Sequence, residues 1–339
     1  MLRAIGEGLR GVARSFGLVP LLLSINVLSA ALLAVPLAVT LERDLAQTDA
    51  AHGMMYGFDF PWWSQWSDAQ TGWTSTFAPD LFGIGFAFKN LDLLLRGNLP
   101  GALFVVREPE AAGGGGKSPG LDPLILGLGV AYLVVQTFLA GGVLATLRGP
   151  QGSWTVRGLL HGSGFYFGRF LRLALVVLMV DLVVFGLNAP LARWADHRAR
   201  EAVSEATAQA WLLGRHGLLL LAILWVNMVS GYAKAVVVLE ERSSAVLAFL
   251  SALSFAVTRP LRAFGHYLAF AAMGVALLTF WHLLDSHWQT AGYATQLVTL
   301  ALAQCLVGGR IALRLALWAG QIDLYRRLGQ APWDAPVVV

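Results

Sequence analysis

The sequence predicts an all-α integral membrane protein with six transmembrane helices. Of its 339 residues, 57% are apolar and 13% are charged, and the mean hydropathy is +0.64. A soluble domain carries about 25% charged residues. A chain this apolar cannot cover a globule with polar groups, which excludes a soluble enzyme and an intrinsically disordered protein.

Six stretches are long enough to cross a bilayer, which takes about 20 mostly apolar residues. The first apolar run is longer than the roughly 7–15 residues of a signal-peptide core, so we expect a retained anchor. The predicted spans are 18–40, 122–147, 171–190, 216–239, 264–284 and 293–316.

Arginine placement predicts the orientation of these spans. The two tails and the connections after the second and fourth spans together carry twelve arginines. On the opposite side, the connection after the third span carries four, which are diluted by Glu201 and Glu205, and the connection after the fifth span carries none. Because cytoplasmic loops are enriched in Lys and Arg, we expect a bacterial inner-membrane protein with both termini in the cytoplasm.

This topology divides the chain into four parts. They are an N-terminal tail with the first span (1–40), an outer-face segment (41–121), a five-span bundle (122–316) and a cytoplasmic C-terminal tail (317–339). The outer-face segment contains a Trp-rich stretch and an apolar run at 79–95. Trp prefers the membrane interface, so we expect this segment to lie on the outer leaflet.

A glycine-rich linker at 109–120 contains a partial match to the phosphate-binding loop G-x-x-x-x-G-K-[ST]. Residues 111–118 read A-A-G-G-G-G-K-S, which lacks the first glycine, and Pro119 follows at once. The functional loop needs a helix N-terminus directly after it to direct backbone N–H groups at phosphate. We therefore expect a flexible linker and no nucleotide binding.

An internal repeat relates two cytoplasmic connections. Residues 153–173 and 243–263 align without a gap at an offset of 90, with seven of 21 positions identical, and each segment ends in R-x-L-R. The repeat predicts two parallel units, 122–190 and 211–284, each built as span, amphipathic helix and span. The matching interfacial helices are expected at 150–168 and 243–258. Arginines near the cytoplasmic ends of the spans are the predicted lipid-headgroup anchors, namely Arg169, Arg172, Arg259, Arg262, Arg310 and Arg314.

Four segments carry a resemblance to known proteins, the first two to a broad group and the last two to a narrower uncharacterised group. They are Y-A-K-A-V-V-V-L-E-E-R-S-S-A-V-L-A-F-L (232–250), F-A-V-T-R-P-L-R (255–262), G-F-D-F-P-W-W (57–63) and F-L-A-G-G-V-L (138–144). The chain resembles uncharacterised bacterial six-span membrane proteins related to the membrane domain found beside glycerophosphoryl diester phosphodiesterases. The catalytic domain of those enzymes has no counterpart here, so the resemblance implies a membrane fold and no phosphodiesterase activity.

Polar residues inside the spans form a predicted layer. Counted at about 1.5 Å per residue from the cytoplasmic ends, Gln136, Asp181, Asn227 and Gln304 fall at similar depths, and Lys234 lies closer to the cytoplasm. A buried Asp is costly in a bilayer, so Asp181 is expected to face Asn227, Lys234 or Gln136. The layer is either a transport or proton site, or hydrogen-bonded packing between helices, which we favour.

No catalytic set is recognisable in the sequence. His282, Asp285 and His287 form H-x-x-D-x-H, a weak candidate metal site, but no further ligand is evident, and a polar helix end is the preferred interpretation. Cys305 is the single cysteine of the chain and lies alone in an apolar run. We therefore expect no enzymatic activity and no cofactor.

Two functions of different classes are compatible with these features. The first is a non-enzymatic scaffold or accessory subunit of an envelope assembly, with membrane lipids and other membrane proteins as partners. The alternative is a transporter or lipid-handling permease that uses the polar layer. A net charge of +4 does not indicate nucleic acid. A packed core would favour the scaffold, and a cavity that reaches the polar layer would favour the permease.

The predicted topology is tested by reporter fusions after residues 110, 155, 205, 250 and 339. We expect them to report outside, cytoplasm, outside, cytoplasm and cytoplasm, because the arginine-rich connections stay inside. A cytoplasmic signal after residue 110 would contradict the topology.

Overall fold

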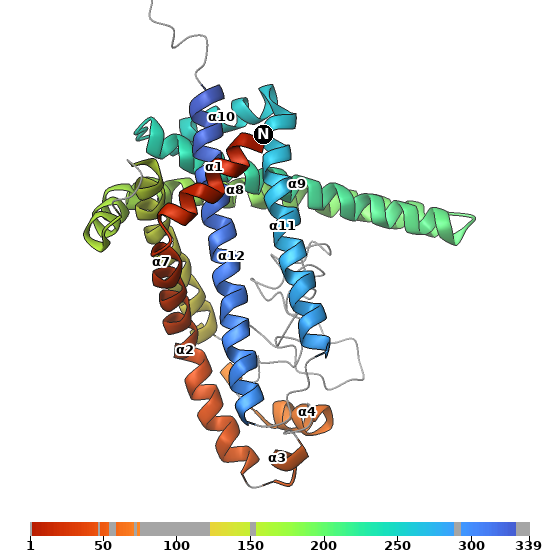
Figure 1. Cartoon of the computed structure of the whole chain (residues 1–339). Helices are drawn as coiled ribbons and strands as arrows, with labels where there is room; N and C mark the ends of the chain where they lie inside the picture. The colour runs from red at the N-terminus through yellow and green to blue at the C-terminus, as the bar shows by residue number, and fades with distance from the viewer. Residues whose placement is uncertain are drawn as a thin grey trace, which may run out of the picture.

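The computed structural model describes residues 2–46, 48–53, 59–70, 73–74, 123–149, 154–287 and 293–329. This part of the chain contains helices and no strand (Figure 1). The helices are α1 (Leu2–Arg14), α2 (Leu18–Leu45), α3 (Ala50–Gly53), α4 (Phe60–Ala69), α7 (Pro123–Arg148), α8 (Val156–Arg200), α9 (Glu205–Leu239), α10 (Ala245–Thr258), α11 (Pro260–His287) and α12 (Tyr293–Leu328).

The predicted all-α membrane class is confirmed. Among the described residues, six helices are long and apolar enough to cross a membrane, namely α2, α7, α8, α9, α11 and α12. Each contains one of the six predicted spans. The predicted apolar run at 79–95, the linker at 109–120 and the partial phosphate-loop match at 111–118 lie outside the described residues.

Two ends of the molecule can be distinguished (Figure 1). The α1 end carries α1, α10 and the C-terminal end of α12, and the α4 end carries α3 and α4. Helices α2, α11 and α12 run between these ends. Helices α8 and α9 pack side by side as a hairpin that extends sideways from the α1 end, across the direction of the other three.

The helix after α7 differs from the predicted first repeat unit. The interfacial helix expected at 150–168 is not a separate element, because α8 continues from Val156 to Arg200. In the second unit, α10 ends at Thr258 and α11 begins at Pro260. Proline disfavours a helical conformation in the residue before it. The position equivalent to Pro260 is Phe170, which lets α8 continue.

The two predicted units nevertheless share a packing arrangement. In each, the C-terminal half of the span contacts the helix that follows it. Gly142 of α7 packs on α8, and the ring of Tyr232 of α9 lies 5.1 Å from the ring of Phe255 of α10. Arg148 and Val238, which are 90 residues apart, hydrogen-bond directly, at 2.5 Å from Nη1 to the carbonyl oxygen. The equivalence of the units stays a prediction.

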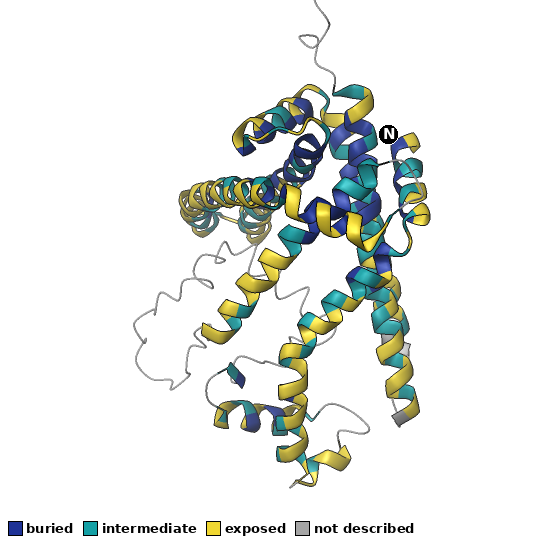
Figure 2. Cartoon of the chain, turned by 90° about the vertical axis from the view of Figure 1, so that its left-hand side faces the viewer, coloured by how far each residue is buried: buried dark blue, intermediate teal, exposed yellow. Residues whose placement is uncertain are grey.

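The buried core lies toward the α1 end. Figure 2 shows the buried residues gathered there, and exposed residues along much of the remaining helices. The C-terminal half of α9 is at its centre, with Tyr232, Ala233 and the run 235–238 fully buried. Helix α1 packs against α12 through Gly8, where an added Cβ would lie 2.4 Å from the Ala316 carbonyl oxygen.

The Trp-rich stretch forms α4, which packs on the far end of α2. Asp59 caps α4 by accepting a hydrogen bond from the Trp62 backbone N–H at 3.0 Å. Trp63 and Trp66 are buried against Leu37. The indole Nε1 of Trp66 donates to the Asp44 carboxylate at 2.9 Å. An indole with one apolar side and one satisfied N–H suits a membrane interface.

The contact between α7 and α8 generates a stability prediction. A Cβ added at Gly142 would lie 2.2 Å from the Leu159 carbonyl oxygen, whereas one at Gly127 would meet nothing within 4 Å. Gly142→Leu is expected to destabilise the protein by about 1–3 kcal/mol through overpacking, measured as a lower thermal unfolding midpoint in detergent. Gly127→Leu is the control, and an equal loss there would contradict the packing argument.

Candidate functional site

A cavity of approximately 1230 Å³ lies between α2, α7, α11 and α12. Most of its wall is aliphatic. Several wall residues are also exposed on the molecule, among them Leu32 and Val35 of α2 and Val135 of α7, so the cavity opens at the apolar surface of the helices. Such a wall fits a hydrocarbon ligand better than a polar one.

A polar bridge in the wall of the cavity joins α2 to α7. The Oδ1 atom of Asn26 accepts hydrogen bonds from the Tyr132 hydroxyl at 2.6 Å and from Nε2 of Gln136 at 3.2 Å. Asn26 also donates from Nδ2 to the Leu22 carbonyl oxygen in its own helix, at 2.9 Å. All three side chains line the cavity.

Cations and one tryptophan line the cavity toward the α1 end. Arg310, Arg314 and Trp318 follow each other at spacings of four residues on α12, which places them on one helical face. The guanidinium of Arg314 lies 4.8 Å from the centre of the Trp318 ring. Lys234 of α9 approaches the same ring, with Nζ at 5.7 Å. These are cation–π contacts.

In the described part of the chain, no acidic side chain balances these cations. None of the described residues that line the cavity is Asp or Glu. Within the described part of the chain, Arg310, Arg314 and Lys234 form no ion pair.

The predicted polar layer is only partly assembled. Gln136 and Gln304 both line the cavity. Lys234 does not line it but contacts the ring of Trp318, which does. Asp181 lies on α8 and Asn227 on α9, away from the cavity wall. Asp181 is half-buried, and the described residues offer it no hydrogen bond or ion pair, so the expected bond to Asn227, Lys234 or Gln136 is not formed.

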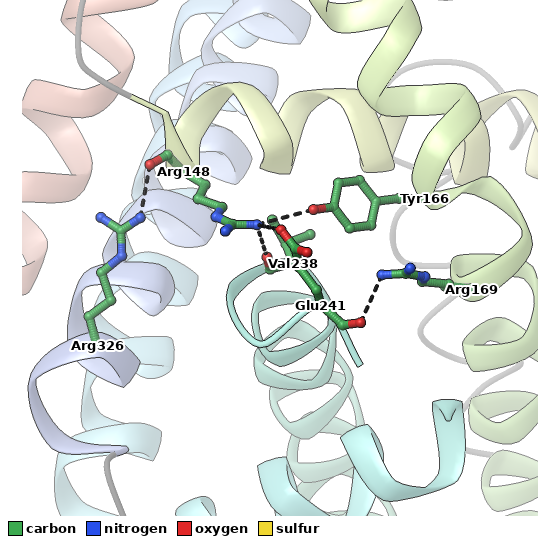
Figure 3. Close-up of polar contacts among 6 residues, drawn as sticks. All are labelled: Arg148, Tyr166, Arg169, Val238, Glu241 and Arg326. Atoms are coloured by element: carbon green, nitrogen blue, oxygen red, sulfur yellow. Dashed lines mark hydrogen bonds and ion pairs between the residues drawn. The ribbon is translucent and has the colours of Figure 1, made fainter. Parts of the chain in front are cut away.

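An arginine network closes the α1 end (Figure 3). Besides the Val238 carbonyl oxygen, Nη1 of Arg148 donates to the Tyr166 hydroxyl at 3.2 Å and pairs with Glu241 at 2.9 Å. Arg326 of α12 donates to the Arg148 carbonyl oxygen at 2.8 Å. The network therefore joins α7, α8, α12 and the turn after α9.

The predicted headgroup anchors have different surroundings. Arg169 donates to the Glu241 carbonyl oxygen at 3.0 Å and so belongs to the network. Arg172 is exposed and donates within its own helix to Gly168, at 3.0 Å. Arg259 lies at the C-terminal end of α10, and Arg262 is exposed on the first turn of α11. Arg310 and Arg314 line the cavity.

The candidate metal site is only partly within the described structure. His282 is exposed on α11, and the side chains of Asp285 and His287 lie outside the described residues. Among the residues that are described, no group of three or more His, Cys, Asp or Glu is placed to hold a metal ion. Cys305 of α12 is exposed.

Sequence reasoning missed three residues of the site. Asn26 is a polar residue within the first span, and Tyr132 is one turn before Gln136, so their positions carried a signal. Trp318 follows Arg310 and Arg314 at helical spacing, which marks one face of α12. The cavity itself depends on how four helices are placed, and no local pattern reports that.

Comparison with known proteins identifies no relative of this chain. No family model, no curated protein and no solved structure matches it. The resemblance to membrane domains found beside glycerophosphoryl diester phosphodiesterases therefore stays a prediction.

The arginine network generates a second stability prediction. Arg148→Gln removes the cation shared by Tyr166, Val238 and Glu241, and is expected to cost about 1–2 kcal/mol because the site is partly exposed. The loss is measured as a lower thermal unfolding midpoint in detergent. Arg157→Gln is the control, since Arg157 is exposed with no hydrogen bond or ion pair to the described residues. Equal midpoints for the two variants would exclude a stabilising network.

Proposed function

We propose that this multi-pass membrane protein handles membrane lipids, by taking lipid acyl chains into the cavity between α2, α7 and α12. The main support for this proposal is the cavity of approximately 1230 Å³ with an aliphatic wall. A small-molecule pocket measures about 300–1,000 Å³. A cavity above that range, open at the apolar surface of transmembrane helices, suits a ligand that arrives from the bilayer.

The cavity favours lipid handling over packing between helices. A purely structural polar layer would be enclosed between spans, with its side chains bonded across the interface. Here Gln136 and Gln304 line a large open space, and the Asn26 bridge lies in its wall. We propose a binding or transport role without catalysis, and no cofactor is needed for it.

The proposed location is the bacterial inner membrane, with the α1 end in the cytoplasm. Support comes from the arginines that gather at this end, among them Arg148, Arg169 and Arg326 (Figure 3). Cytoplasmic enrichment of arginine is the general rule for short loops.

A scaffold role is the second candidate. The observation that favours it is the α8–α9 hairpin, which extends beyond the other helices and exposes apolar side chains such as Met179, Leu187 and Leu213. Such a surface suits the helices of another membrane protein as well as lipid.

Filling the cavity tests the proposed function. Gly129 and Ala30 line the cavity, and a Cβ at Gly129 would meet nothing within 4 Å. Gly129→Trp combined with Ala30→Trp is expected to reduce the lipid retained by the purified protein several-fold, because the added rings occupy the space of the acyl chains. Native mass spectrometry of protein extracted in mild detergent measures the retained lipid.

The matched control places the same two side chains outside the cavity. Gly127→Trp combined with Leu28→Trp changes the same two helices at positions that do not line the cavity. This variant is expected to retain lipid as the unmodified protein does. If the cavity-filling variant also retains as much lipid, the proposed function is excluded.

A further inference from the structure

We infer that the cavity selects an anionic lipid, whose acidic headgroup is bound by Arg310 and Arg314 beside Trp318. This inference rests on the proposed function and adds the chemical class of the ligand. It follows from three features of the described residues: uncompensated positive charge, its position at one end of the cavity, and an apolar wall that extends away from it.

The positive charges repel one another in the structure as it stands. Arg310 and Arg314 are one helical turn apart on the same face of α12, and Arg314 and Lys234 both lie against the Trp318 ring, at 4.8 Å and 5.7 Å. Like charges near a surface of low polarity are costly, and an anion placed between them removes that cost. Among the described residues that line the cavity none is acidic, so a ligand that carries its own negative charge would compensate the two arginines.

The cations lie at one end of the cavity, where they can bind the headgroup of a ligand and not its middle. They lie toward the α1 end of the cavity, near Leu22 and Val143. From Asn26 the wall of α2 continues for nine residues to Val35, about 14 Å along the helix. On α7 the facing wall continues toward Ile125. One end of the cavity is therefore cationic and the rest is aliphatic, as a ligand with one acidic head and hydrocarbon tails requires.

Arg310 and Arg314 lie some distance along α12 from the arginine network at the α1 end. Arg326, in the network at the α1 end, is 12 residues after Arg314, which corresponds to about 18 Å along α12. A snorkelling side chain extends its charged group away from the apolar layer. The guanidinium of Arg314 lies against Trp318, which is four residues closer to the α1 end and lines the cavity, so the exposed Arg310 and Arg314 present their charge at this end of the cavity.

A guanidinium pair also suits a phosphate in detail. Arginine presents a planar fork of N–H donors that binds two oxygens of one phosphate. Arg310 and Arg314 are one helical turn apart, so two such forks can reach the same group. Lys234, behind the shared Trp318 ring, adds positive potential without lining the cavity.

The test compares binding of two lipids with identical acyl chains. Detergent-solubilised full-length protein is incubated with an equal mixture of phosphatidylglycerol and phosphatidylcholine, and native mass spectrometry measures the ratio retained. We expect the unmodified protein to prefer phosphatidylglycerol. Arg310→Gln with Arg314→Gln is expected to reduce that preference about tenfold while phosphatidylcholine is still retained.

Two further variants keep the result interpretable. Arg310→Lys with Arg314→Lys preserves the charge and is expected to keep most of the preference, which separates charge from folding. Arg3→Gln with Arg157→Gln removes two exposed arginines outside the cavity and is expected to change nothing. An excess of inorganic phosphate is expected to leave the bound phosphatidylglycerol in place, because the tails contribute to binding.

Any other result contradicts one specific claim, either the anionic selectivity, the lipid headgroup or the proposed function. Equal retention of both lipids by the unmodified protein, or an unchanged preference in the glutamine variant, excludes anionic selectivity and leaves lipid handling standing. Displacement by inorganic phosphate shows a site for a free anion and excludes the lipid headgroup. If the cavity-filling variant retains both lipids as the unmodified protein does, the proposed function itself is excluded.

Discussion

Helices inside a bilayer gain little from hydrophobic burial, so close packing of small side chains decides where they meet. The C-terminal half of α9 shows this constraint most clearly. Ala233, Ala235 and the valines at 236–238 are fully buried, and α7, α8, α10, α11 and α12 all contact this helix. At Gly231 an added Cβ would lie 2.6 Å from the Gln321 amide, so α12 approaches the backbone of α9 directly. The arginine network then fixes the end of this packed unit, because Arg148 bonds to the last turn of α9 and to Glu241 after it.

The cavity exists because that packing does not extend to α2. Helix α2 contacts α12 through Gly308, where an added Cβ would remain 3.9 Å from Val19, and it reaches α7 through the Asn26 bridge. Polar contacts hold helices at a greater separation than glycine contacts do, and the space between α2 and α7 remains open. The same face of α12 that lacks a close neighbour carries Arg310 and Arg314. Charge and free volume therefore coincide for one structural reason.

Sequence alone predicted the helical class and the six spans, since both depend on local hydrophobicity. It also placed Gln136 and Gln304 at one depth, and the two do line one cavity. Depth is a single coordinate, however, and it does not specify the direction in which a side chain points. Asp181 was placed at the same depth but belongs to the α8–α9 hairpin, which extends away from α2 and α12. The continuity of α8 was missed because its interfacial and apolar parts were read as two elements, although Phe170 permits one helix where Pro260 ends another.

The two ways in which helices are joined here suit different tasks. Glycine-mediated contacts, as at Gly142 and Gly8, bring backbones together over a wide area and leave no space for a third molecule. The Asn26 bridge joins α2 to α7 through one acceptor atom, and both of its donors, Tyr132 and Gln136, come from α7. Hydrogen bonds of this kind contribute about 1 kcal/mol each inside membranes, so separating the two helices at the bridge costs far less than separating α7 from α8. A rigid unit around α9, with α2 packed on α12 near its start and joined to α7 by a weak polar bridge, is compatible with the proposed entry of a lipid from the side.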